Sequence, residues 1–158
     1  MRRLLSLLFF FFALSTTPAL AQPAPKGPQA QRVPAGKVQL DVLVLHATNT
    51  HATVDKRVSK YLKYLKHLAY TGYSPLKDYT LTLALNKVER FEIAGGRKVV
   101  VELLQRDERR ARLRIQIIAP KGGKLLDTTM SVSRNASVIV AGPRYQDGIL
   151  VLPLTARY

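Results

Sequence analysis

Three histidines, at positions 46, 51 and 67, have side chains that could hold a metal or move a proton near neutral pH. Zinc needs three or four convergent ligands, but the chain has no cysteine and only ten acidic residues. His46 ends an expected strand, and His51 lies five residues further on, in the loop that leads to a helix. The pattern predicts no metal site and no cofactor, and a hydrolytic site would require His46 or His51 to meet a carboxylate in a pocket.

Motifs of nucleophilic or phosphate chemistry are missing from the sequence. No serine or threonine stands in a nucleophile elbow. The glycine pairs Gly95-Gly96 and Gly122-Gly123 are typical of hairpin turns rather than of phosphate-binding loops. We therefore expect no catalytic residues and a protein that is not an enzyme.

A first row of basic residues lies in the segment VDKRVSKYLKYLKHL, residues 54–68. At about 100° per residue, one line of a helix carries four basic residues: Lys56, Lys60, Lys63 and His67. Tyr64 stands beside this line. No acidic residue lies at i+4 spacing, so the like charges repel one another. The row is either a solvated face or a docking face for an anionic partner, and both interpretations stay open.

A second basic row is expected on a strand, residues 110–118, as Arg110, Arg112 and Arg114. Arginine can hold phosphate or carboxylate through two parallel hydrogen bonds. The expected register places Glu102 opposite Arg114 and Asp127 opposite Gln116, which favours a neutralised surface ladder. Each such pair contributes a few tenths to about 1 kcal/mol.

The helix that carries the first row is expected to run from residue 54 to about Tyr70. Thr53 is the predicted N-cap with Asp55 in the first turn, and Gly72 and Pro75 predict the end. Its apolar side contains Val54, Val58, Tyr61, Leu62, Leu65, Leu68 and Ala69. The neighbouring strands offer a large apolar surface and no other helix to cover it, so we expect this side to pack on a sheet rather than in a membrane.

The remaining segments have the period of two that is typical of strands. The expected strands are residues 38–46, 79–85, 87–93, 98–105, 110–118, 124–133, 137–141 and 148–155. Leu43 and Leu45 fill the second face of the first strand, which predicts cover on both sides. The fold class is therefore predicted as α+β: an antiparallel β-sandwich or curled sheet of about seven or eight strands with one amphipathic helix packed on it.

The register of the middle hairpins follows from their apolar residues. Placing Arg106 opposite Arg110 gives three apolar inward pairs: Leu103–Leu113, Val101–Ile115 and Val99–Ile117. On the next hairpin the same rule predicts three further inward pairs, of which one contains a threonine: Ile117–Leu126, Ile115–Thr128 and Leu113–Met130. A slip of one residue would turn arginines inward.

The N-terminal residues 1–21 have the layout of a secretory signal peptide, with Arg2 and Arg3, an apolar run over 4–14, and cleavage expected before Gln22. Residues 22–36 hold four prolines and two glycines and are expected to form a disordered leader. One folded domain is expected over 37–158. The lack of cysteine suits a bacterial periplasm, with secretion as the alternative.

The formal net charge of +15 falls to +13 when the two arginines of residues 1–21 are removed. This charge favours anionic partners such as acidic proteins, envelope polymers or lipid head groups, although it also serves solubility alone. Export argues against nucleic acid, and no small-molecule substrate is inferred.

Several segments together carry a resemblance: Leu45–Ala47, Thr71–Ser74, Leu125–Thr129, Val138–Pro143 and Asp147–Leu152. Over roughly residues 38–154 the chain resembles small exported proteins of deltaproteobacteria. Among these it is similar to the small periplasmic subunits of the myxobacterial gliding-motility envelope complex. The resemblance implies a role in the cell envelope and brings no catalytic residues.

The sequence as a whole predicts a non-catalytic periplasmic binding or scaffold subunit of a cell-envelope assembly, with motility machinery as one possibility. Other envelope proteins are the expected partners, bound either along an open sheet edge or at the basic rows: Lys56, Lys60, Lys63, Tyr64, His67, Arg110, Arg112 and Arg114. The alternative is a free cationic binder of anionic envelope polymers or lipid head groups. A hydrolase is the least favoured function.

Overall fold

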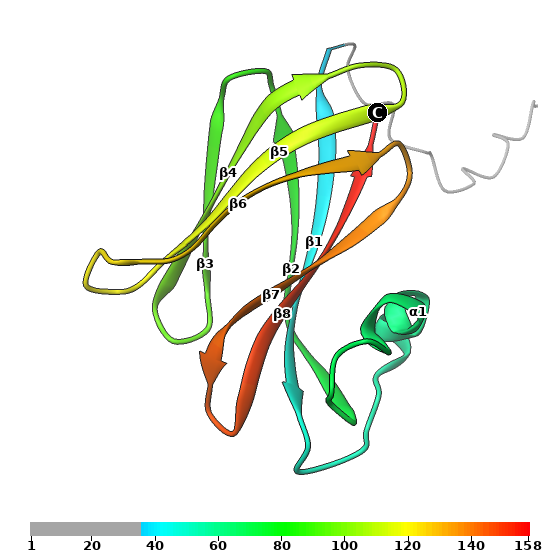
Figure 1. Ribbon diagram of the computed structural model, residues 1–158, viewed down its shortest axis with the longest axis vertical. Helices are drawn as coiled ribbons and strands as arrows, with labels where there is room; N and C mark the ends of the chain where they lie inside the picture. The colour runs from blue at the N-terminus through cyan, green and yellow to red at the C-terminus, as the bar shows by residue number, and fades with distance from the viewer. Residues whose placement is uncertain (1–35) are drawn as a thin grey trace, which may run out of the picture. The chain divides into compact units, whose positions relative to one another are not determined.

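The computed structural model describes residues 36–158, which form eight β-strands in two four-stranded sheets and one short helical segment (Figure 1). All paired strands run antiparallel. The predicted fold class, a β-sandwich with one helix, is confirmed. The predicted signal peptide and the leader up to residue 35 lie outside the described residues.

The two sheets draw their strands from different parts of the chain. The first sheet has the order β2 (Gly72–Leu83), β1 (Val38–Thr48), β8 (Gly148–Arg157) and β7 (Ser137–Tyr145). The second has the order β3 (Val88–Ile93), β4 (Arg97–Arg106), β5 (Arg110–Ile118) and β6 (Lys124–Ser133). The second sheet is therefore a run of consecutive hairpins, whereas β1 and β8 meet at the centre of the first.

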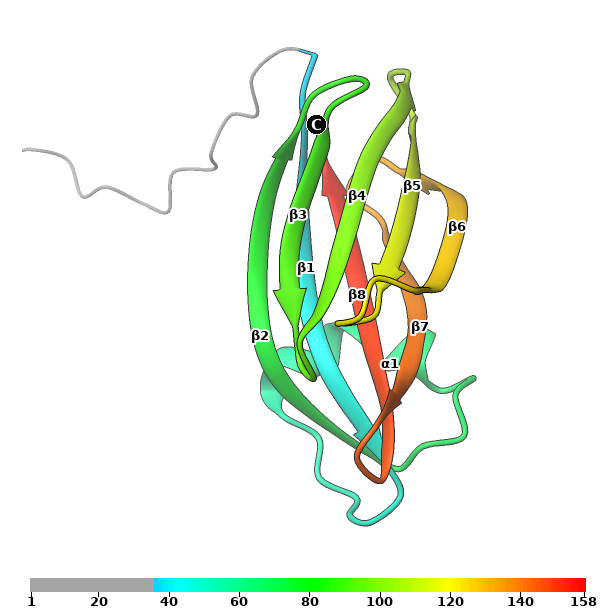
Figure 2. The same ribbon diagram turned by 90° about the vertical axis from the view of Figure 1, so that its left-hand side faces the viewer.

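The main core lies between the two sheets, which stack face to face (Figure 2). Successive side chains of a strand point to opposite faces, so every second residue enters this core. Its fully buried members include Val38, Leu40, Val99, Leu103, Leu113, Ile115, Ile117, Leu152 and Leu154. A second, smaller apolar cluster lies on the outer face of the first sheet, under the helical segment.

The predicted register of the middle hairpins is confirmed for all six inward pairs. Glu102 lies opposite Arg114 and Asp127 opposite Gln116, also as predicted. The predicted pairing of Arg106 with Arg110 is wrong. An irregularity between Leu103 and Gln105 shifts the register, so that Arg106 pairs with Ala111. Such a bulge adds one residue to one strand and changes the partner of every residue beyond it.

The helical segment is shorter than predicted. It consists of a 3-10 helix, η1 (Lys56–Tyr61), followed by one turn of α-helix, α1 (Leu62–Leu65). Asp55, rather than Thr53, is the N-cap, and its carboxylate accepts a 2.8 Å hydrogen bond from the backbone N–H of Arg57. Gly72 does not cap the helix, because β2 begins at that residue.

Pro75 lies inside β2 rather than in the loop that the sequence suggested. The strand begins seven residues before the predicted Tyr79, and the pairing with β1 shifts between Val44 and Leu45, opposite this proline. Proline cannot donate to a sheet, and it is tolerated on an edge strand or at a bulge. β2 is an edge strand with a bulge, and so both conditions are met.

The helical segment packs on the outer face of the first sheet, as predicted for its apolar side. Val58, Tyr61 and Leu65 are buried there, and Leu68 is partly buried. They pack against Leu43, Leu45, Ala47, Tyr73 and Val151. β1 is thus covered on both faces, as Leu43 and Leu45 predicted.

Three members of the predicted apolar side are not buried: Val54, Leu62 and Ala69. A 3-10 helix has three residues per turn rather than 3.6, so Val58 and Tyr61 share a face and Leu62 turns away from it. Leu62 is 40% exposed. No helix within residues 36–158 has the length and hydropathy needed to cross a bilayer.

Candidate functional site

A cleft of about 390 Å³ lies between the helical segment and the strands β7 and β8. Three residues of the predicted helical docking face line it: Lys60, Lys63 and Tyr64. The other lining residues come from the far end of the chain: Asn135, Ser137, Thr155 and Arg157. Lys56 and His67 are exposed but do not line the cleft, so the predicted row is only partly brought to one site.

The floor of the cleft is made of hydroxyl groups. Ser137 and Thr155 are cross-strand neighbours on β7 and β8, and their Oγ and Oγ1 atoms lie 2.8 Å apart. The hydroxyl of the buried Tyr61 lies 3.4 Å from the same Thr155 Oγ1. This contact fixes the helical segment to the sheet at the point where the lysines project. The floor can therefore donate hydrogen bonds as well as accept them.

The rim of the cleft is cationic. Lys60 Nζ lies 4.8 Å from the ring centroid of Tyr61, and Lys63 Nζ lies 4.8 Å from that of Tyr64. Neither lysine forms an ion pair with a residue of the described chain, 36–158. Two ammonium groups held over aromatic faces, with hydroxyls beneath them, favour an anionic ligand such as a carboxylate or a phosphate.

Arg157 completes the rim but already has a partner. Its Nη2 lies 2.6 Å from Asp41 Oδ2, and Asp41 also accepts a 3.1 Å hydrogen bond from Thr80 Oγ1. The cleft therefore offers two lysines without carboxylate partners and one arginine whose charge is balanced. Sequence reasoning missed Arg157, because its nearness to Lys60 follows only from the pairing of β8 with β1.

The second predicted row, on β5, has a different environment. Arg114 donates two hydrogen bonds to Asp127, from Nε at 2.9 Å and from Nη2 at 2.8 Å. Gln116 and Lys124 also donate to this carboxylate. The Arg114 guanidinium, with these two donors, holds the pKa of Asp127 well below its usual range. The neutralised surface ladder of opposite charges that the sequence predicted is therefore present at Arg114.

Arg110 and Arg112 line a separate cleft of about 330 Å³, beside the turn between β4 and β5. Asp107 lies in the same cleft. Its carboxylate accepts hydrogen bonds of 2.7 Å from the backbone N–H groups of Arg109 and Arg110, which lowers the pKa of Asp107. An ionised carboxylate thus stands next to these arginines, and the β5 row has an acidic neighbour at each end.

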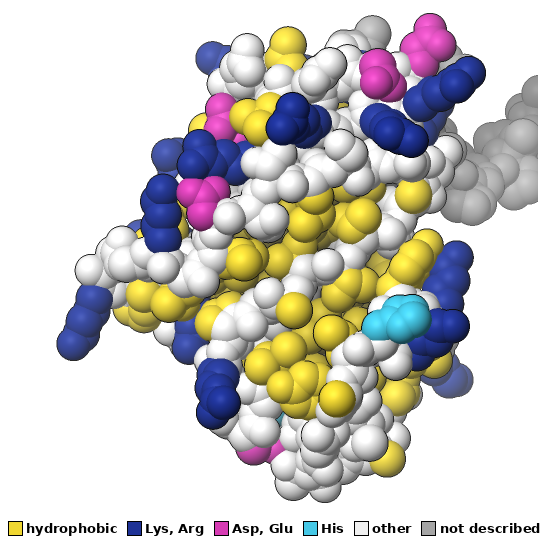
Figure 3. Space-filling model, viewed as in Figure 1, with side chains coloured by type: hydrophobic (Ala, Val, Ile, Leu, Met, Phe, Trp, Pro, Cys, Tyr) yellow, Lys and Arg dark blue, Asp and Glu magenta, His cyan; other side chains and the backbone are white. Residues whose placement is uncertain are grey.

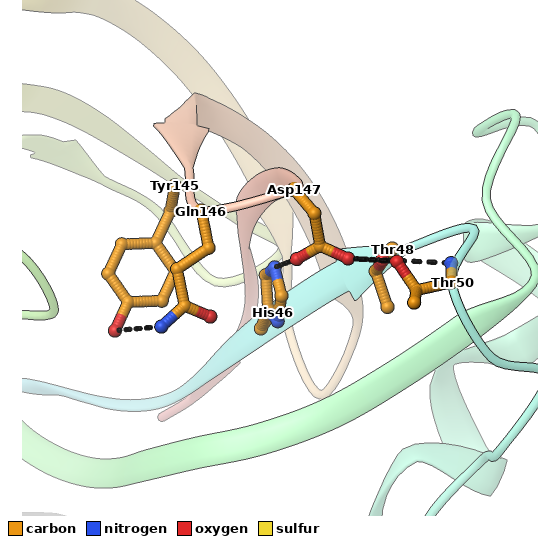
Figure 4. Close-up of polar contacts among 6 residues, drawn as sticks. All are labelled: His46, Thr48, Thr50, Tyr145, Gln146 and Asp147. Atoms are coloured by element: carbon orange, nitrogen blue, oxygen red, sulfur yellow. Dashed lines mark hydrogen bonds and ion pairs between the residues drawn. The ribbon is translucent and has the colours of Figure 1, made fainter.

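A polar cluster that the sequence did not reveal joins β1 to the turn between β7 and β8 (Figure 4). Asp147 accepts hydrogen bonds from the hydroxyls of Thr48 and Thr50, and its Oδ1 lies 3.2 Å from Nε2 of His46. The two threonine hydroxyls, together with a smaller contribution from His46, lower the pKa of Asp147 to about 2. The His46 ring stands edge-on to Tyr145, with centroids 5.4 Å apart.

This cluster places His46, but not His51, beside a carboxylate. Thr48 is buried, both threonine hydroxyls donate to Oδ2 of Asp147, and Oδ1 faces Nε2 of His46. The cluster therefore ties the end of β1 to the opposite turn. Within residues 36–158, no group of three or more His, Cys, Asp or Glu side chains is arranged to hold a metal ion.

Comparisons of the chain with protein-family models, with curated proteins and with solved structures find no match.

Proposed function

We propose that this chain is a non-catalytic binding or scaffold subunit of a periplasmic cell-envelope assembly, and that it holds an anionic group of its partner in the cleft of Lys60, Lys63 and Arg157. The observation that carries the proposal is the convergence of two lysines without carboxylate partners on a hydroxyl floor. The layout of residues 1–21 supports export. The resemblance to gliding-motility proteins supports a motility assembly as the specific case.

The alternative is a free cationic binder of anionic envelope polymers or lipid head groups. The formal net charge of +13 that remains when the two arginines of residues 1–21 are subtracted from +15, and the two basic rows, support it. The two functions differ in where the charge must lie. Bulk attraction depends on the number of charges, whereas a docked partner depends on the cleft.

A pair of matched double variants tests this difference. Lys60→Gln with Lys63→Gln removes two charges from the cleft, and Arg110→Gln with Arg112→Gln removes two charges from the β5 row. In a pull-down, we expect the unmodified exported chain and its Arg110/Arg112 variant to capture the same envelope protein in equal amounts. The amount captured by the Lys60/Lys63 variant should be at least tenfold lower. Melting followed by circular dichroism checks that both variants fold.

The same variants test the alternative on vesicles that contain phosphatidylglycerol. Equal loss of vesicle binding in both variants, with a steep decrease as salt rises, and no specific protein captured by the unmodified chain, would establish the free cationic binder and overturn the scaffold proposal.

A further inference from the structure

The side of the sandwich between β6 and β7 carries unpaired strand edges. β6 and β7 follow each other in sequence but end two different sheets, and among residues 36–158 each pairs with only one other strand. In Figure 3 apolar side chains are visible between and along these two strands. Partly buried apolar residues on the two strands pack against the two apolar clusters: Leu126, Met130, Val138, Ile139 and Tyr145.

The opposite side of the sandwich, between β2 and β3, is closed by side chains. The ring of Tyr79 packs on that of Phe91 with centroids 4.4 Å apart, and its hydroxyl donates to the backbone oxygen of Glu92. β3 also carries three charged residues, and β2 carries Pro75, a bulge and the charged pair Lys77-Asp78. Charges, prolines and bulges are the usual means by which proteins keep edge strands from pairing.

The edge of β7 lacks such protection over residues 137–141, SVIVA. These residues are uncharged and mostly β-branched, and the register becomes irregular only beyond Ala141. Apolar side chains point to both faces: Val138 and Val140 face the main core, and Ile139 faces the outer cluster. A segment with this composition is well suited to pair with another strand.

The pairing of β7 with β8 determines which residues of β7 direct their backbone N–H and C=O groups to the open edge. The N–H of Ala156 donates to the oxygen of Ala136, just before β7. Because facing pairs alternate in an antiparallel ladder, Val138 and Val140 bond to β8, whereas Ser137, Ile139 and Ala141 present their N–H and C=O groups to the open edge. Pro153, which has no N–H, lies opposite Ile139 and fits this alternation.

The open edge of β7 begins at the cationic cleft, because Ser137 belongs to both. A strand added antiparallel to β7 would bring its C-terminal end beside Ser137, where Lys60 and Lys63 lack carboxylate partners. Further positive charge lies at both ends of the edge, at Arg134 and Arg144. This charge opposes pairing with a second copy of the chain and favours a strand that ends in an anion.

We propose that β7 accepts a C-terminal segment of a partner protein as an additional antiparallel strand, and that the terminal carboxylate of this segment lies in the cleft of Lys60 and Lys63. The inference deepens the proposed function and rests on it. Main-chain hydrogen bonds supply the affinity of such a complex, and pockets at alternate positions supply the specificity. The partner segment needs apolar residues at alternate positions, and its chain must end at the cleft.

Amide hydrogen exchange tests the inference. The probe is a heptapeptide with a free C-terminus, selected for binding to residues 22–158 from a library that is random in sequence. We expect the amides of Ser137, Ile139 and Ala141 to become protected when the peptide binds, and amidation of its C-terminus to weaken binding at least tenfold. Lys60→Gln with Lys63→Gln should weaken it to the same extent, and Arg110→Gln with Arg112→Gln should leave it within twofold.

The outcomes separate this inference from the proposed function. If the Lys60/Lys63 variant loses its partner while the three amides stay unprotected in the complex, the cleft binds an anion and the strand addition is wrong. If that variant keeps its partner, the proposed function itself is wrong. Protection of the three amides in the chain without peptide, by a second copy or by another segment of the chain, would also overturn the inference.

Discussion

The two basic rows of this protein have the same kind of charge but different neighbours. On β5, antiparallel pairing brings Asp127 of the adjacent strand within hydrogen-bonding distance of Arg114. On the helical segment, Lys60 and Lys63 lie over tyrosine rings in a cleft with hydroxyls and an arginine that is already paired, and neither has a carboxylate partner within residues 36–158. In a sheet, the strand register determines which side chain lies opposite a charged residue. A helix packed on a sheet has no such register, and the charged residues on its outer side can remain without partners.

The largest expected effect comes from removing the support of the helical row. Leu65→Ala empties a fully buried position under the helical segment and should lower the free energy of unfolding by about 2–5 kcal/mol. Leu62→Ala, on the same turn but 40% exposed, should cost about 0.5 kcal/mol. Urea unfolding measures both. Equal losses would mean that the segment is not anchored through Leu65.

A smaller effect is expected from a substitution that makes the β5 row resemble the helical row by removing its carboxylate partner. In the background of Lys60→Gln with Lys63→Gln, Asp127→Asn leaves Arg114 without its carboxylate. We expect binding to phosphatidylglycerol vesicles to rise about fivefold, the effect of one additional unopposed charge at an anionic surface. Glu108→Gln makes the same change in net charge at a turn. If it raises binding equally, total charge governs and the register does not matter.

Adding a carboxylate beside the helical row should have a still smaller effect on binding. Ser59→Asp places a carboxylate one residue before Lys60 on the exposed side of the helical segment and should weaken peptide binding at the cleft about twofold, the effect of one exposed carboxylate close to the lysines. Thr82→Asp, on the exposed part of β2, supplies the same charge away from both rows. Fluorescence anisotropy distinguishes them, and an equal decrease would show that the effect is not local.

A separate effect is expected on stability in acid, at the cluster around Asp147. The pKa of this carboxyl is lowered from 3.8 to about 2 by Thr48 and Thr50. A group whose pKa is depressed in the folded state stabilises the fold above its unfolded pKa, and this stabilisation is lost as the pH falls through the folded value. We expect the unfolding free energy to decrease between about pH 4 and pH 2, and the decrease to be smaller in Asp147→Asn.

Such a measurement sharpens the comparison of the rows because neither lysine of the cleft has a carboxylate partner within residues 36–158. Peptide binding at the cleft should decrease as the terminal carboxylate of the peptide becomes protonated, at about pH 3.5, and Asp147→Asn should leave this decrease at the same pH. A change in that pH in Asp147→Asn would connect the cleft to the cluster at His46, which the contacts described here do not do.

The sequence predicted those parts of the fold that depend on neighbouring strands. The strands over 110–118 and 124–133 have the predicted bounds, because alternating apolar residues and turn residues act over short distances. The inward pairs from Leu103 to Met130 follow for the same reason.

Features that depend on distant segments could not be predicted. The cleft needs Arg157 beside Lys60, and the polar cluster needs Asp147 beside Thr48. Both depend on the pairing of β1 with β8, for which no local pattern exists. The 3-10 geometry of η1 was also hidden, because Val58 and Tyr61 are three residues apart and lie on one face of either helix type.

The placement of β1 beside β8 also has a consequence for the order in which the protein folds. The hairpins from β3 to β6 join segments that are close in sequence, so they can form early. The pairing of Val42 with Leu154 closes a loop of more than a hundred residues, and contacts of this kind form slowly. A chain that is synthesised from its N-terminus must therefore keep its first strand unpaired with β8 until the last strand is complete.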